Sequence, residues 1–239
     1  MKVLFVFSLE DIQSIKTPLR SWAEIQFGIS YISSVLKANS HQTQLLVLGS
    51  EHWLDSASII NKTMDEYDPR LVCFTAVYSQ YSFIENTAKY IKGHWPDKYL
   101  LVGGVHATLQ PDEVIAGPFN AMCIGEGEFP TLELCRQLEY NDAPHGIPNV
   151  WFKLSDGSIE RNQQRDFIQN LDSMPFLDRD MWRPWIIEQI SSELSMLLGR
   201  GCPYDCTYCS NHALRKIACA RPIRQPFLSN PVSVLGQSG

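Results

Sequence analysis

The sequence has little of several features that assign proteins to common classes. Only 19% of its 239 residues are charged and its formal net charge is -6, so no basic surface for a polyanion is expected. No stretch approaches the roughly 18 consecutive apolar residues that span a membrane, and the apolar N-terminal run is too short for a signal peptide. These absences argue against a nucleic-acid partner and a membrane span, and they favour a cytoplasmic protein.

Nucleotide-binding fingerprints are also missing. No GxGxxG follows the first apolar run and no GxxxxGK[ST] occurs, so neither a dinucleotide site nor a P-loop is indicated. The seven cysteines are an odd number, and three of them lie within eight positions, which is not the pattern of a secreted disulfide framework. Cys73, Cys123 and Cys135 lie in apolar segments and are predicted to be small core residues.

The first 140 residues alternate strand-like and helix-like segments. Apolar runs of strand length occur at residues 2–7, 44–48, 70–75, 99–103 and 121–124. Between these runs, apolar residues recur at helical spacing. The pattern predicts an α/β fold in which a five-stranded parallel sheet is covered by helices on both faces.

The segments that follow these strands are the candidate ligand site, because ligands of such sheets bind beyond the carboxyl ends of the strands. Two glycine motifs are notable there, since glycine lets the backbone approach a large flat ligand closely. Each motif alone could be a tight turn, but together they favour a ligand. The candidate ligand-binding residues are Ser8, Thr75, Gly103, Gly104, His106, Gly125, Glu126 and Gly127.

A cysteine loop, residues 199–209, contains Cys202, Cys206 and Cys209. Three closely spaced thiolates favour zinc or an iron-sulfur cluster. Structural zinc sites use four ligands, whereas three thiolates fit a 4Fe-4S cluster whose fourth iron stays open to a small molecule. A zinc site completed by His212, and a chance spacing without a metal, are the alternatives.

The spacing CxxxCxxC, with Tyr208 before the last cysteine and an Arg-Gly-Cys-Pro lead-in, resembles the cluster loop of the radical S-adenosylmethionine (SAM) superfamily. The resemblance implies a 4Fe-4S cluster on the three loop cysteines, with the open iron chelating SAM and Tyr208 near its adenine. It also implies an electron donor such as flavodoxin or ferredoxin. In such enzymes the cofactors supply the difficult chemistry and the protein positions them.

The glycine motifs extend this resemblance. Gly-Gly-Val-His-Ala-Thr at residues 103–108 and Gly-Glu-Gly-Glu at residues 125–128 resemble the cobalamin-binding domain that precedes the cluster domain in one subgroup, and residues 171–176 resemble its connector. The resemblance implies a Rossmann-like (flavodoxin-like) cobalamin-binding domain at residues 1–140, a hairpin and linker at 141–190, and the start of a radical SAM partial (β/α) barrel at 191–239. The implied reaction is methyl transfer to an unactivated carbon, or a related radical reaction, on a small molecule that the sequence does not identify.

The sequence departs from this family in two respects. No His follows the first strand in the position of a D-x-H-x-x-G motif, so His coordination of cobalt is not supported, and His106 either contacts the corrin or makes a loop hydrogen bond. Only 30 residues follow Cys209, without a Gly-Gly-Glu motif, so we expect a truncated barrel and assign no catalytic residue. The rival hypothesis is a cobalamin-binding or structural module without turnover. An RNA methylthiotransferase is disfavoured because its extra cysteines and a basic face are missing.

Three further expectations concern the second half of the chain. Residues 148–154 and 158–161, joined by Asp156-Gly157, predict a hairpin. Residues 194–198 predict a short buried strand before the cysteine loop. Trp182 and Trp185 are predicted to pack the linker against the domain.

Overall fold

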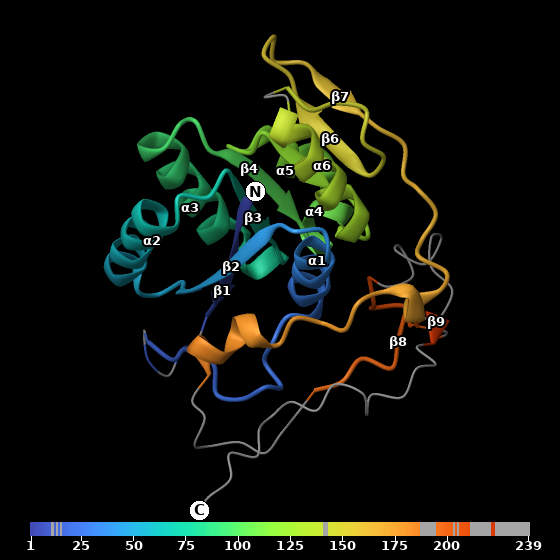
Figure 1. The fold of residues 1–239 in the computed structure, drawn as a ribbon, viewed down its shortest axis with the longest axis horizontal. Helices are drawn as coiled ribbons and strands as arrows, with labels where there is room; N and C mark the ends of the chain where they lie inside the picture. Colours follow the sequence, from blue (N-terminus) through green and yellow to red (C-terminus); the bar gives the residue numbers. More distant parts are fainter. Residues whose placement is uncertain are drawn as a thin grey trace, which may run out of the picture.

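The computed structural model describes residues 1–10, 12, 14, 16–140, 143–186, 195–202, 204, 206–210 and 221–222. A seven-stranded sheet lies at its centre, in the order β2-β1-β3-β4-β5-β6-β7 (Figure 1). The first five strands pair in parallel, so the predicted five-stranded parallel sheet is confirmed. The strands are β1 (Lys2–Leu9), β2 (Gln42–Gly49), β3 (Leu71–Thr75), β4 (Tyr99–Gly103), β5 (Ala121–Cys123), β6 (Val150–Lys153) and β7 (Ile159–Arg161).

Helices cover both faces of this sheet, as the sequence predicts (Figure 1). Successive strand residues point to opposite faces, so Phe5 packs in a core with α1 and α6, while Leu4 and Val6 pack in a second core with α2 and α3. The result is a three-layer α/β sandwich. The helices are α1 (Phe27–Ala38), α2 (Trp53–Tyr67), η1 (Tyr78–Gln80), α3 (Tyr81–His94), α4 (Val105–Leu109), α5 (Pro111–Ala116) and α6 (Glu128–Tyr140).

The predicted hairpin forms, and it belongs to the sheet. β6 pairs antiparallel with β5, with Ala121 opposite Phe152, and β7 pairs antiparallel with β6. The sequence placed this hairpin between two domains, because its turn residues reveal the hairpin and not the strand it pairs with. The sheet thus continues beyond its parallel part, and Phe152 is buried in the same core as α1 and α6.

After the hairpin the chain returns across the molecule to α1 (Figure 1). This return segment, residues 170–186, contains η2 (Leu171–Ser173) and η3 (Asp180–Trp185). Trp182 is 0% exposed and donates a hydrogen bond from its Nε1 to Ser30 Oγ at 2.8 Å. Asp178 accepts from Ser33 Oγ at 2.6 Å and pairs with Lys37 Nζ at 2.7 Å. The prediction that tryptophans pack the linker down is therefore confirmed.

The segment that leads into the cysteine loop differs from the prediction. Residues 195–198 are not a strand, and Met196 and Leu198 are 52% and 66% exposed, so the buried strand predicted at 194–198 is wrong for these residues. The apolar run resembles a core strand in composition, but residues 195–198 pair with no strand among the residues that the structure describes. A short strand follows instead, β8 (Gly199–Arg200), paired with β9 (Arg221–Pro222).

Several expectations fall on residues that the structure does not describe. His212, the fourth ligand in the zinc alternative, lies outside the described residues, as do residues 187–194 and 223–239. In the described part of the chain, no helix is both long and apolar enough to cross a membrane.

Candidate functional site

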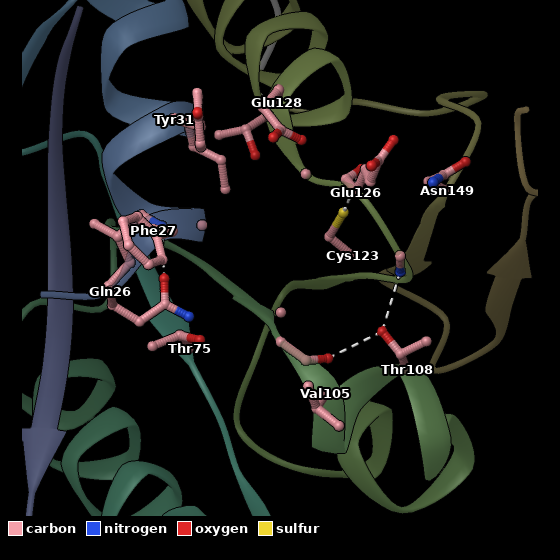
Figure 2. Close-up of a pocket in the computed structure, with 18 of the residues that line it drawn as sticks. Gln26, Phe27, Tyr31, Thr75, Val105, Thr108, Cys123, Glu126, Glu128 and Asn149 are labelled. Atoms are coloured by element: carbon pink, nitrogen blue, oxygen red, sulfur yellow. Dashed lines mark hydrogen bonds between the residues drawn. The ribbon is translucent and has the colours of Figure 1, made fainter. Parts of the chain in front are cut away.

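A cavity of about 380 Å³ opens at the carboxyl ends of β3, β4 and β5. Its floor is the sheet face that carries Leu101, and its walls are the N-terminal turn of α1 and the segment that enters α6 (Figure 2). We call it the strand-end cavity. It lies where the sequence predicts a ligand, because both glycine motifs line it.

The glycines after β4 have different roles. Gly103 has the same strand parity as Leu101 and so faces the cavity; a Cβ there would meet only Cys123, at 3.7 Å. Gly104 has a φ of 98°, and a Cβ there would lie 2.8 Å from the carbonyl oxygen of Ala76 and 2.9 Å from Thr75 Oγ1. Gly103 therefore leaves the cavity open, whereas Gly104 permits the close approach of two loops.

Thr108 connects the two glycine motifs by hydrogen bonds (Figure 2). Its Oγ1 donates to the carbonyl oxygen of Gly104 at 2.9 Å and accepts from the Gly125 N–H at 3.0 Å. Gly125 has a φ of 78°, which favours glycine in this turn. A Cβ on Gly127 would lie 2.9 Å from Cδ1 at the end of the Ile32 side chain, so the turn lies close to α1 at this point.

Two carboxylates on the same turn meet an arginine from the cysteine loop. Glu126 Oε1 lies 2.9 Å from Arg200 Nη1, and Glu128 Oε1 lies 2.6 Å from Arg200 Nη2. The Arg200 guanidinium also lies over the ring of Tyr31, 4.9 Å from its centroid. Burial alone would lower the pKa of Arg200, but Glu128 and Glu126 outweigh it and hold this pKa above its ordinary value. Arg200 therefore remains a half-buried, paired cation.

The structure brings seven of the predicted site residues to one place. They line the strand-end cavity and are Thr75, Gly103, Gly104, Gly125, Glu126, Gly127 and Cys202. Ser8 and His106 do not line it. Ser8 donates to Gln80 Oε1 at 2.8 Å, and His106 is 4% exposed with its ring 4.6 Å from that of Tyr81.

The three thiols of the cysteine loop are free and partly exposed. Cys202 lines the strand-end cavity, while Cys206 and Cys209 do not, and Tyr208 is 91% exposed. Among the described residues, no group of three or more His, Cys, Asp or Glu side chains could hold a metal ion as placed. The loop thus has the three thiols that a cluster needs, but the structure does not place them around one point. Cys73, Cys123 and Cys135 are buried, as predicted.

Several lining residues were not predicted. Gln26, whose Oε1 accepts from the Ile29 N–H at 2.9 Å to cap α1, lines the cavity, but glutamine is not among the favoured N-cap residues, so no local signal marks it. Asn149 has a φ of 71° and donates to the carbonyl oxygen of Ile124 at 2.8 Å. Arg165 and Phe167 reach the cavity from a segment interpreted as linker, and nothing in the local sequence marks them.

Comparison with protein families and curated proteins gives this site a context. Residues 24–134 match the family model of the B12 binding domain. An uncharacterized methyltransferase from Pyrococcus horikoshii, PH0819, is 26% identical over 189 residues, which are 77% of this chain and 40% of that protein. The hopanoid C-3 methylase of Methylococcus capsulatus is 25% identical over 189 residues, covering 77% of this chain and 35% of that protein.

Solved structures have a similar fold. The cobalamin-dependent SAM radical enzyme OxsB, with aqua-cobalamin and SAM bound, superposes with a TM-score of 0.70 at 19% identity, over 93% of this chain and 30% of that chain. The radical SAM methyltransferase TsrM from Kitasatospora setae superposes with a TM-score of 0.63 at 16% identity, over 88% of this chain and 41% of that chain. At these identities the likeness shows the fold alone. The chain spans 40% or less of the curated relatives named above.

Proposed function

Because residues 24–134 match the B12-binding domain, in a chain related to cobalamin-dependent radical SAM enzymes, we propose that the strand-end cavity binds part of a cobalamin. The observation that carries this proposal is the bare backbone of Gly103 and Gly125 at the carboxyl ends of β4 and β5. A flat ligand can approach such backbone without meeting a side chain.

The size and lining of the cavity suit one part of such a ligand. Its volume of about 380 Å³ would hold one substituent of such a ligand. Phe27 and Leu101 offer apolar surface, and Thr75 and Asn149 offer polar groups. Figure 2 shows Phe27, Thr75 and Asn149 around the cavity. A few polar groups in an otherwise apolar cleft are typical of cofactor sites.

The second part of the proposal concerns the cysteine loop. Its three thiols match the chemistry of 4Fe-4S ligands. By the same family resemblance, Tyr208 would lie beside the adenine of SAM. When bound, a reduced cluster supplies the electron that cleaves SAM, and cobalamin carries a methyl group to the substrate. The chain's own residues hold and orient these groups. The proposed activity of the whole protein is methyl transfer, or a related radical reaction, on a small molecule, with electrons from a flavodoxin or ferredoxin.

The cobalamin site is tested by titrating hydroxocobalamin into the purified chain, followed by absorbance and calorimetry. Gly103→Val should lower the affinity at least ~10-fold, about 1.4 kcal/mol, because the new side chain projects into the cavity. Gly93→Val is the matched control, since nothing lies within 4 Å of a Cβ there and Gly93 is in α3 on the other face. Equal affinity in both variants, or no binding by the wild type, would contradict the proposal.

The cluster is tested by anaerobic reconstitution with iron and sulfide. We expect about four irons per chain and a broad absorbance that bleaches on reduction. Cys206→Ala should lose most of this iron. One zinc per chain that is lost in His212→Ala would favour the zinc alternative, and cobalamin binding without any cluster would favour a module without turnover.

A further inference from the structure

The ion pairs of Arg200 connect two parts of the chain that are far apart in sequence. Arg200 and Glu126 are 74 positions apart, and the side chains of both are 14% exposed. Glu128 is 3% exposed, and it takes the second arm of the same guanidinium. The fork geometry of arginine allows both carboxylates to be bound at once.

The turn that supplies these carboxylates is also part of the cavity wall. Glu126 and Glu128 alternate with Gly125 and Gly127, and all four residues line the strand-end cavity. Glu126 has another fixed partner, because its Oε2 accepts from the Ile168 N–H at 2.8 Å. A displacement of this turn would therefore move the partners of Arg200 as well.

Residues 195–200 form a short segment, and side-chain contacts bind both of its ends. Arg200 makes these contacts at the C-terminal end. Ser195 lies at that start: its carbonyl oxygen accepts from Arg179 Nη2 at 2.7 Å, and its Oγ donates to the carbonyl oxygen of Ala23 at 3.3 Å. Residues 195–200 are thus bound at both ends to the first domain. Cys202 follows two positions later and lines the same cavity.

The energetics of these contacts favour one defined position of residues 199–202. The buried carboxylate of Glu128 would be costly without a cation, and the largely covered guanidinium of Arg200 would be costly without a carboxylate. The guanidinium also stacks on Tyr31 of α1 at 4.9 Å, which restricts its approach further. Few positions of residues 199–202 satisfy all three contacts together.

We propose that Arg200 is a positioning residue, which fixes the first thiol of the cysteine loop against the strand-end cavity and thereby sets the separation of the two bound cofactors. This inference rests on the proposed function for its consequence, but the docking of the loop stands on the contacts of this chain alone. Because the glycine turn carries both the cavity wall and the two carboxylates, occupancy of the cavity and docking of the loop should affect each other equally.

The first test uses the chain without cofactors. Hydrogen–deuterium exchange of the peptide covering residues 195–202 should be roughly tenfold faster or more in Arg200→Gln than in the wild type, while peptides of β4 and α3 stay unchanged. Arg161→Gln is the matched control, because Arg161 pairs with Asp112 at 2.9 Å in an exposed position. Equal exchange of residues 195–202 in the wild type and Arg200→Gln overturns the proposal, whether or not any cofactor binds.

The second test uses the loaded protein and a spectroscopic signature. Pulsed EPR of the reduced cluster with cob(II)alamin should give a narrow distance distribution in the wild type and Arg161→Gln, and a broad one in Arg200→Gln. Arg200→Lys keeps the charge without the fork, so it should restore this distribution only in part, and it serves if Arg200→Gln does not fold. A narrow, unshifted distribution in both Arg200 variants would overturn the positioning role, because stability alone does not alter this distance in folded molecules.

Discussion

The strongest test of the return segment is the pair formed by Trp182 and Ser30. Trp182 is fully buried, its Nε1 donates to Ser30 Oγ at 2.8 Å, and its ring meets Phe7 edge-on at 5.4 Å between centroids. This contact joins η3 to α1 and so fixes the point from which the chain continues to the cysteine loop. The two substitutions Trp182→Phe and Ser30→Ala should each lower the free energy of unfolding, but for different physical reasons.

The reasons follow from which polar groups each substitution leaves without a partner. In Trp182→Phe, Ser30 Oγ keeps its bond to the Gln26 carbonyl oxygen at 2.9 Å, so the lost hydrogen bond costs about 1 kcal/mol and the smaller ring adds a similar amount. In Ser30→Ala, the indole N–H is buried without a partner, which costs about 2 kcal/mol. In the Trp182→Phe background no indole remains, so Ser30→Ala should cost under about 1 kcal/mol.

Urea unfolding followed by far-UV circular dichroism measures all four proteins, since this signal does not depend on the tryptophan. The expected coupling between the two positions is about 1 kcal/mol or more. Additive effects would refute the assignment of this hydrogen bond. Trp182→Ala should cost about 3–5 kcal/mol, and a cost below about 1 kcal/mol would contradict its burial in the core.

Three further predictions concern thiols, pH and the cavity wall. Burial raises the pKa of Cys123 and of Cys135 to about 12, so iodoacetamide at mildly alkaline pH should label the three loop thiols and leave these two unlabelled, as read by mass spectrometry. Burial and the N-terminal ammonium lower the pKa of His41, so the unfolded state binds more protons than the folded state. The free energy of unfolding should therefore fall as the pH drops below about 6.5. His41→Asn should weaken this dependence on pH, as measured by urea unfolding at several pH values. Asn149→Ala should cost about 2–3 kcal/mol in thermal unfolding because two hydrogen bonds are lost at a φ of 71°, and Asn149→Gly, which tolerates this φ, should cost less.

Much of the fold could be predicted because its signals are local. Each parallel strand is a short apolar run, such as residues 99–103, and each helix places its apolar residues on one face. The pairing of β6 with β5 could not be predicted, since the Asp156-Gly157 turn specifies the hairpin and not its neighbour in the sheet. The same limit explains the strand expected at residues 194–198, because an apolar composition does not specify a pairing partner and residues 195–198 have none in the described part of the chain.

The parts of the site that depend on local backbone geometry could be predicted. The parts that depend on contacts between segments far apart in sequence could not. Gly103, Gly104 and Gly125 follow strands, and the rule for parallel sheets brings them to one edge. His106 was a candidate because of its place after β4, but its ring turns into the protein against Tyr81. Arg200 was interpreted only as part of the loop lead-in, because an ion pair across 74 positions leaves no local signature.

The Gly-Glu-Gly-Glu turn carries a different physical requirement at each of its four positions, which a simple βα turn does not need. Gly125 takes a left-handed φ of 78°, and Gly127 lies close to α1, where a Cβ would be 2.9 Å from Ile32 Cδ1. Glu126 binds both Arg200 and the Ile168 N–H, and Glu128 lies in the first turn of α6, where a carboxylate is also favoured by the helix dipole. A turn that only reversed the chain would require the first glycine alone. The other three residues contact α1, Ile168 and Arg200, so this turn joins the wall of the strand-end cavity to the segment that carries Cys202.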